Sequence, residues 1–174
     1  MRVLVADDDL EIARAYRFAL EKNNHEVIIT TDGEECIRVY RHNIEQANRV
    51  TSNGPSSYLS FDAVILDYKM PKKDGIEVAK EILEMNSNQR IIFASAYVEE
   101  TLEDAVKQLK RVVELMQKPF DASSLVDTIE DMEIYGNLKN LMKSVRRISG
   151  DQPTQKQLKD LLESLRKIQK HRTF

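Results

Sequence analysis

The chain has 174 residues, of which 41% are hydrophobic and 32% charged, and its net charge at pH 7 is −3. This size and composition suit one soluble domain with a smaller appendage, long enough to bury a sizeable core. The only cysteine, Cys36, excludes disulfides and cysteine-based metal clusters. We see no signal peptide and no apolar run of about 18 residues, so we expect a cytoplasmic protein with no membrane partner.

The first apolar run of the chain ends in three consecutive acidic residues. Val3–Ala6 is followed by Asp7, Asp8 and Asp9. A short apolar run bounded by polar residues predicts a strand that is buried on both faces of a parallel sheet. Residues 10–22 then carry apolar side chains at helical spacing, which predicts a helix with Asp9 as its N-terminal cap.

A second strand and a second helix follow the first pair. Val27–Ile29 is the predicted strand, and the helix starts at Asp32 or Gly33. The helix carries Cys36, for which we expect a buried and inert thiol. Residues 43–60 then form a long connection to the third strand, and their Asn-Gly-Pro-Ser-Ser portion predicts a surface loop. We interpret this stretch as a tolerated insertion rather than a binding loop.

The third apolar run leads directly into a single carboxylate. Ala63–Leu66 precedes Asp67, and the Met70–Pro71 pair then breaks the strand. Open α/β sheets place their ligand sites at the carboxyl ends of the strands, which is where Asp67 is expected. A carboxylate buried there needs compensating charge or hydrogen bonds. Residues 75–85 predict the third helix.

Two further apolar runs end in a hydroxyl and an ammonium group. Residues 90–96 carry Ser95 near their end, and residues 112–120 carry Lys118 just before a proline. A fourth helix is expected at residues 99–109 between them. With a fifth helix to follow, five strands alternate with five helices, which predicts an α/β fold with a doubly wound parallel sheet. Right-handed crossovers then bring the polar strand ends to one rim of that sheet.

The acidic residues expected at this rim predict a bound cation. Clustered carboxylates raise one another's pKa unless a positive charge offsets them, and Mg²⁺ prefers such oxygen ligands. Capping of a helix explains Asp9 alone, so metal binding is the favoured interpretation of Asp7 and Asp8. Beside the metal, Asp67 would act as a nucleophile and Lys118 would hold phosphoryl oxygens.

These residues, in this order, resemble the receiver domain of two-component response regulators, the CheY-like family with a flavodoxin-like (βα)5 fold. The resemblance covers residues 1–131 and rests on Asp7, Asp8, Asp67, Met70-Pro71, Asp74-Gly75, Ser95-Ala96 and Lys118-Pro119-Phe120. It implies that Asp67 is the phosphoacceptor for a histidine kinase or phosphotransfer protein.

The resemblance also implies a role for each residue around the phosphoacceptor. Mg²⁺ would be held by Asp7, Asp8, Asp67 and the backbone carbonyl of Lys69. Lys118 and Ser95 would bind the phosphoryl oxygens. The bond before Pro119 is a candidate cis peptide, as in the family.

The chain departs from the family pattern at the switch position. Where the family carries Tyr or Phe three residues before the lysine, this chain has Leu115. Ser95 and Leu115 therefore remain switch candidates together with Tyr97, which could substitute for the missing aromatic. Lys69 lies where the water that hydrolyses the phosphoryl group must pass, and could alter its lifetime.

Residues 132–174 lie beyond the resemblance and predict a basic α-helical hairpin extension. Residues 133–174 hold ten Lys and Arg against four acidic residues, a net charge of +6, which leaves −9 for residues 1–132. The apolar stripes of two amphipathic helices need burial against the first domain, a second copy of the chain or another protein. We favour a protein-interaction or homodimer-forming element.

Three functional classes compete for the whole chain. The favoured one is a response regulator that switches a protein-interaction surface and is no enzyme beyond its own phosphorylation and dephosphorylation. A transcriptional regulator that binds nucleic acid through the basic extension is the alternative, although charge alone gives only nonspecific affinity. A Mg²⁺-dependent phosphohydrolase is less favoured, because no cap domain fits the sequence.

Overall fold

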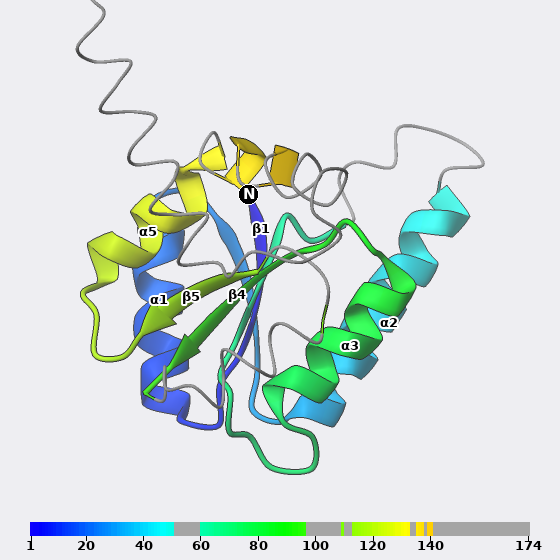
Figure 1. Cartoon of the computed structure of the whole chain (residues 1–174), viewed down its shortest axis with the longest axis horizontal. Coiled ribbons are helices and arrows are strands. Elements are labelled where there is room, and N and C mark those ends of the chain that lie inside the picture. Colours follow the sequence, from blue (N-terminus) through cyan, green and yellow to red (C-terminus); the bar gives the residue numbers. More distant parts are fainter. Residues whose placement is uncertain (51–59, 97–108, 110–112, 133–134, 138, 141–174) are drawn as a thin grey trace, which may run out of the picture.

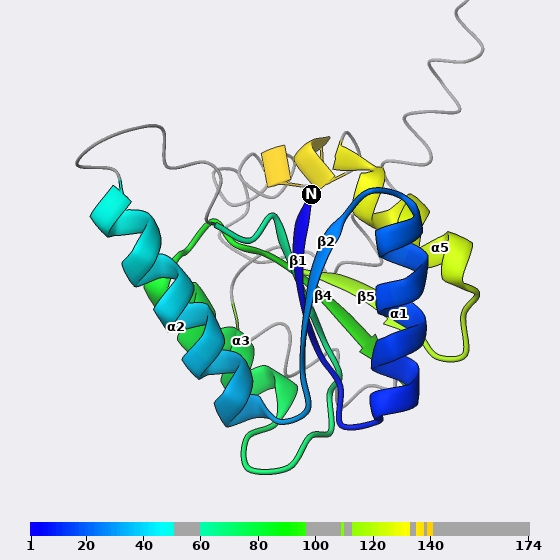
Figure 2. The same cartoon turned by 180° about the vertical axis from the view of Figure 1, so that it is seen from behind.

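The computed structural model describes residues 1–50, 60–96, 109, 113–132, 135–137 and 139–140. Five parallel strands form one sheet in the order β2-β1-β3-β4-β5, with helices on both faces (Figures 1 and 2). The strands are β1 (Arg2–Ala6), β2 (Glu26–Thr30), β3 (Ala63–Leu66), β4 (Arg90–Ser95) and β5 (Glu114–Gln117). The helices are α1 (Leu10–Lys22), α2 (Gly33–Val50), α3 (Gly75–Met85) and α5 (Ala122–Glu130). This arrangement confirms the predicted doubly wound α/β sheet.

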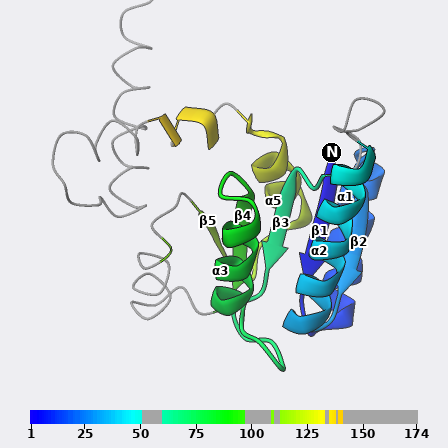
Figure 3. The same cartoon turned by 90° about the vertical axis from the view of Figure 1, so that its right-hand side faces the viewer.

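The helices form two layers that cover the two faces of the sheet. Helices α1 and α5 lie on one face, and α2 and α3 lie on the other (Figures 1 and 3). Because strand side chains alternate between faces, Leu4 and Leu66 pack toward α2 and α3, whereas Val5 and Ile65 pack toward α1 and α5. All four side chains are almost completely buried. Because helices cover β3 on both sides, all of its residues are apolar.

The register of the strands aligns their carboxyl ends. Ala6 of β1 pairs with Leu66 of β3, and Leu66 pairs with Phe93 of β4. At the end of β4, Ser95 pairs with Gln117 of β5. The residues that follow these positions therefore meet at one rim, as the crossover rule predicts.

Aspartate side chains cap the described helices, and Asp32 accepts from the N–H of Glu35 at the start of α2. Asp9 accepts hydrogen bonds from the backbone N–H groups of Glu11 and Ile12 at the start of α1. Asp74 forms a capping box with Glu77 at the start of α3, and Asp121 accepts from the Ser124 N–H at the start of α5. Each cap satisfies backbone donors that the first helical turn leaves free.

The structure corrects the expected end of the second helix. Residues 43–50 continue α2 instead of starting a connection. Ile37, Tyr40 and Ile44 extend one apolar face of the helix, and Asn43 is buried beside it. The loop expected further along falls at residues 51–59, outside the described residues.

Other expectations fall partly or wholly outside the described residues. This holds for the fourth helix up to residue 108, for Tyr97 and for most of the hairpin extension. Cys36 is completely buried in α2, and burial raises the pKa of its thiol to about 12, in line with the expected inert side chain. Among the helices that the structure does describe, none combines the length and the apolar character needed to cross a membrane.

A buried arginine connects the amino end of the sheet to α5. Arg90, the first residue of β4, makes a two-pronged ion pair with Glu114 of β5, with N–O distances of 2.7 and 3.0 Å. The same guanidinium donates to the carbonyls of Thr128 and Ile129 in the last turn of α5. The central carbon of the guanidinium, Cζ, also lies 4.9 Å from the ring centre of Tyr135. One side chain thus joins two strands, a helix end and the first part of the extension.

Candidate functional site

An ammonium group joins two carboxylates at the carboxyl rim of the sheet. The Nζ atom of Lys118 lies 2.6 Å from Oδ2 of Asp7 and 2.8 Å from Oδ1 of Asp67. The side chain of Asp7 is only 2% exposed, and those of Asp67 and Lys118 are 12% and 14% exposed. Three residues far apart in the sequence therefore form one compact, partly buried charge cluster.

Each carboxylate in this cluster is fixed by the backbone as well as by the lysine. Oδ1 of Asp7 accepts a hydrogen bond from the N–H of Asp9 at 3.1 Å, and Oδ2 of Asp67 accepts from the N–H of Lys69 at 2.8 Å. The backbone N–H of Asp67 donates to the carbonyl of Ala6 in the neighbouring strand. All four carboxylate oxygens thus have a partner, and the two acids have a defined orientation.

The lysine follows the edge strand β5 and reaches the acids across the end of β4. Its backbone N–H donates to the carbonyl of Ser95 at 2.8 Å, and the Lys118–Pro119 peptide bond is cis. Ser95 is 1% exposed and is the last residue of β4, so it lies at the same rim. The structure therefore brings Asp7, Asp67, Ser95 and Lys118 to one rim.

Burial and ion pairing act against each other in the pKa values of this cluster. Burial raises the pKa of the Asp7 carboxyl group, although Lys118 opposes that effect. Burial by itself would lower the pKa of Lys118, but its hydrogen bonds to Asp67 and Asp7 outweigh burial and leave this pKa raised. The ammonium group is therefore charged at neutral pH and can hold an anion at the rim.

The chemistry of the donor set suits a hard cation. The candidate ligands of Mg²⁺ supply oxygen atoms only, which is the ligand type that this ion prefers. Asp7 and Asp67 face each other across Lys118, whereas Asp8 is exposed beside them. Across the described stretches, no three acidic, histidine or cysteine side chains already converge as a metal cluster. Two of the three predicted acidic ligands are thus brought together.

The remaining switch candidate lies away from the charge cluster. Leu115 of β5 is half-buried and packs on the side of the sheet that α2 and α3 cover. The neighbouring Met116 packs on the other side, toward α1 and α5. Leu115 therefore fills core space at the place where the family carries an aromatic ring.

Gly75 lets the loop after Asp67 fold tightly against the end of β3. A Cβ atom at this position would lie 2.2 Å from the backbone oxygen of Asp67 and 3.2 Å from the ring of Phe93. The N–H of Gly75 also donates to the carbonyl of Tyr68. A side chain here would have to displace the strand end that carries Asp67.

We therefore expect Gly75→Ala to destabilise the fold by about 1–3 kcal/mol in urea unfolding, because the new methyl group overpacks the strand end. Gly136→Ala is the matched control, since a Cβ there meets no atom within 4 Å. Its stability should stay the same or rise by up to about 1 kcal/mol, the usual gain of alanine over glycine in a helix. Equal losses in both variants would contradict the close approach at Gly75.

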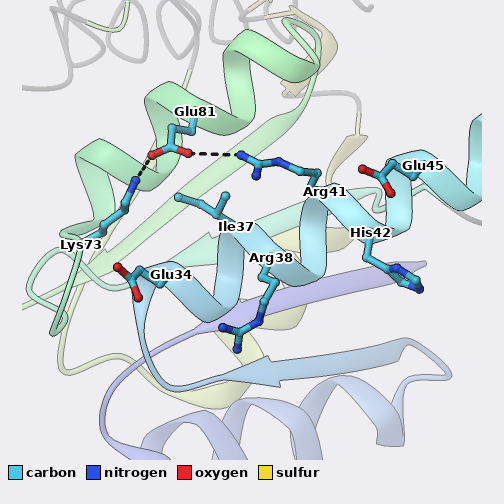
Figure 4. Close-up of a pocket in the computed structure, with 8 residues that line it drawn as sticks. All are labelled: Glu34, Ile37, Arg38, Arg41, His42, Glu45, Lys73 and Glu81. Carbon is cyan, nitrogen blue, oxygen red and sulfur yellow. Dashed lines mark hydrogen bonds and ion pairs between the residues drawn. The ribbon is translucent and has the colours of Figure 1, made fainter.

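An open groove lies between α2 and α3 (Figure 4). It has a volume of about 490 Å³ and is lined by basic and acidic side chains in equal number, together with His42 and Ile37. Glu81 is paired with Lys73 and lies 3.8 Å from Arg41, so the charges largely neutralise one another. None of the residues of the charge cluster lines this groove, and it brings together no set of groups suited to catalysis.

Sequence reasoning missed one residue beside the rim. Tyr16 lies in the stretch for which the sequence predicts only a helix, but its ring stacks on that of Phe120, with centres 5.3 Å apart and planes 15° apart. Helical periodicity gives no signal for such a contact, because it depends on where the loop after β5 comes to lie.

Comparison with known proteins is consistent with this geometry. The family model for the response regulator receiver domain matches residues 3–130. The response regulator MprA of Mycobacterium avium is 24% identical over 168 residues, which cover 86% of this chain and 67% of that protein.

Two solved structures show the same similarity. A response regulator receiver domain protein from Clostridium thermocellum is 27% identical with a TM-score of 0.59, and the match covers 75% of this chain and 91% of that one. The CheX–CheY–BeF3–Mg²⁺ complex from Borrelia burgdorferi is 25% identical with a TM-score of 0.58, covering 78% and 89% of the two chains.

Proposed function

The chain belongs to the response regulator receiver domain family, and we propose that it accepts a phosphoryl group on Asp67 from a histidine kinase or phosphotransfer protein. Receiver domains are phosphoacceptor signalling modules of two-component systems, for which phosphoaspartate and Mg²⁺ are typical. The observation that carries the proposal is the pair of hydrogen bonds from Lys118 to Asp67 and Asp7 at the rim.

The proposed transfer begins with a carboxylate oxygen of Asp67 as the nucleophile. This oxygen forms a bond to phosphorus while the bond from phosphorus to the donor nitrogen breaks, and the nitrogen keeps the electron pair and is reprotonated. The Lys118 ammonium then pairs with a phosphoryl oxygen, and the Ser95 hydroxyl group donates to another. The N–H of Lys69, which now binds Oδ2 of Asp67, keeps the carboxylate in place during attack.

Asp7, Asp8, Asp67 and the carbonyl of Lys69 are the groups that would hold Mg²⁺. When bound, the ion supplies positive charge that offsets the negative charge of the phosphoryl oxygens. Asp7 is already oriented by the Asp9 N–H and by Lys118. Asp8 is exposed on the same loop and is accessible to a hydrated ion.

The proposed output acts through the extension at residues 132–174. Its net positive charge opposes the net negative charge of the rest of the chain, which supports binding to a protein partner or to a second copy of the chain. The same charge favours nucleic acid as the second candidate partner. With this function the protein would work in the cytoplasm, where its kinase presents the phosphoryl group.

The proposal is tested by incubating the protein with acetyl phosphate and Mg²⁺ and measuring bound phosphoryl groups by intact-protein mass spectrometry. We expect up to one phosphoryl group per chain, and none when EDTA removes the metal. Repeated turnover of small phosphoesters would instead support a phosphohydrolase. A stoichiometry of zero in the presence of Mg²⁺, with the fold intact, would contradict the proposed function.

A further inference from the structure

An aromatic pair joins helix α1 to the segment that follows Lys118. Tyr16 lies in α1, which follows the acidic loop, and Phe120 lies two residues after Lys118. Their rings are 5.3 Å apart and nearly parallel. Tyr16 is 7% exposed, and Phe120 packs on the same core cluster between the sheet and helices α1 and α5. The stack is thus a buried contact between α1 and the segment that follows β5.

The segment from Lys118 to Asp121 is anchored at each end as well as by this stack. At its start, the Lys118 N–H bonds to the carbonyl of Ser95. At its end, Asp121 caps α5 through the N–H of Ser124. Between these points, the ring of Phe120 stacks on that of Tyr16 and connects the segment to α1. Movement of Phe120 would therefore change the direction from which the lysine approaches the acids.

The acidic residues of the rim act electrostatically on the phenol group of Tyr16. Burial raises its pKa first, and the charges of Asp7, Asp67 and Asp9 raise it further. The hydroxyl group therefore stays neutral, and the side chain adds no negative charge where a phosphoryl group would be received.

We propose that Tyr16 is a positioning residue, which holds the ammonium group of Lys118 between Asp7 and Asp67 by stacking on Phe120. The expected effect of Tyr16 on phosphoryl uptake rests on the proposed function. The placement of the ammonium group itself can be tested without phosphorylation. Tyr16→Leu removes the flat ring but keeps an apolar side chain, and Tyr16→Phe keeps the ring.

The first experiment measures how fast acetic anhydride acetylates Lys118, by mass spectrometry, relative to the exposed Lys80 of α3 in the same molecule. Tyr16→Leu should raise the ratio of the Lys118 rate to the Lys80 rate by about three- to ten-fold, which corresponds to the free energy that one aromatic pair contributes. Tyr16→Phe should leave it unchanged. Phe18→Leu is the matched control, because Phe18 lies on the same helix but is 72% exposed.

The second experiment measures the initial rate of phosphoryl uptake from acetyl phosphate. Tyr16→Leu should slow uptake by about three- to ten-fold, but should have no further effect in a Lys118→Ala background, because its effect passes through the lysine.

A Tyr16→Leu protein that folds normally by circular dichroism and leaves the Lys118 acetylation ratio unchanged would overturn the inference. If that variant unfolds, Phe120→Leu removes the stack from the other side and must raise the same ratio. A wild-type chain that takes up no phosphoryl group would contradict the proposed function, while the acetylation ratios would still decide the role of Tyr16.

Discussion

Asp67→Asn is expected to abolish phosphoryl uptake from acetyl phosphate and Mg²⁺. The asparagine side chain has nearly the same shape, but its amide lacks the negatively charged oxygen that attacks phosphorus. Lys118 would keep its bond to Asp7, so the arrangement of the rim should survive the substitution. Intact-protein mass spectrometry should therefore find no added phosphoryl group on a folded variant.

Asp127→Asn is the matched control for this substitution. Asp127 is exposed on α5 and takes no part in the charge cluster, so the variant should be labelled like the wild type. Phosphoryl uptake by the Asp67→Asn variant at the wild-type level would show that a different residue is the acceptor. Equal losses in the two variants would point to a general effect of removing acidic residues.

Arg90→Ala is expected to lower the free energy of unfolding by about 3–5 kcal/mol, the usual cost of breaking a buried ion pair by removing one partner. The guanidinium is 2% exposed, and its loss leaves the carboxylate of Glu114 buried without its ion-pair partner. The carbonyls of Thr128 and Ile129 also lose their donors. Urea unfolding followed by circular dichroism measures the change.

Two further variants separate this buried pair from ordinary surface charge. Arg41→Ala removes an arginine that is 58% exposed and 3.8 Å from its partner, and should cost less than about 1 kcal/mol. An Arg90→Met, Glu114→Leu double variant should lose less stability than the sum of its two single variants, since no unpaired charge remains. Equal losses for Arg41→Ala and Arg90→Ala would contradict the structural role of the buried arginine.

The sheet and the main residues of the site were predictable because each strand is short, apolar and followed at once by a polar group. Ala63–Leu66 was placed within its observed bounds, and the cap at Asp9 was confirmed. Parallel strands with right-handed crossovers place their carboxyl ends on one rim, so the convergence of Lys118 on Asp67 followed from chain order.

Features that depend on contacts across the fold were not predictable in this way. The pairing of Arg90 with Glu114 depends on the register between β4 and β5 and on where α5 ends. The stack of Tyr16 on Phe120 depends on the path of a loop, which helical periodicity does not describe. The length of α2 was underestimated because most residues after Tyr40 are polar, although Ile44 continues the apolar face of the helix.

Under the proposed function, phosphorylation of Asp67 would change the surroundings of Lys118. Lys118 now occupies the space between Asp7 and Asp67 and offsets their charge. A phosphoryl group on Asp67 would bring additional negative charge to this lysine, so the lysine has a new partner without leaving the rim. The segment after Lys118 is held by the Phe120 stack and the Asp121 cap and leads directly into α5, so we expect α5 to be the element that responds under the proposed function.

The most direct test of the account is to identify the residue that carries the phosphoryl group. The protein is incubated with acetyl phosphate and Mg²⁺ and then treated with borohydride, which reduces an aspartyl phosphate to homoserine, and its peptides are sequenced by mass spectrometry. The account predicts homoserine at position 67 and at no other aspartate. Homoserine at another aspartate, or a phosphoryl group on a histidine or serine instead, would contradict it.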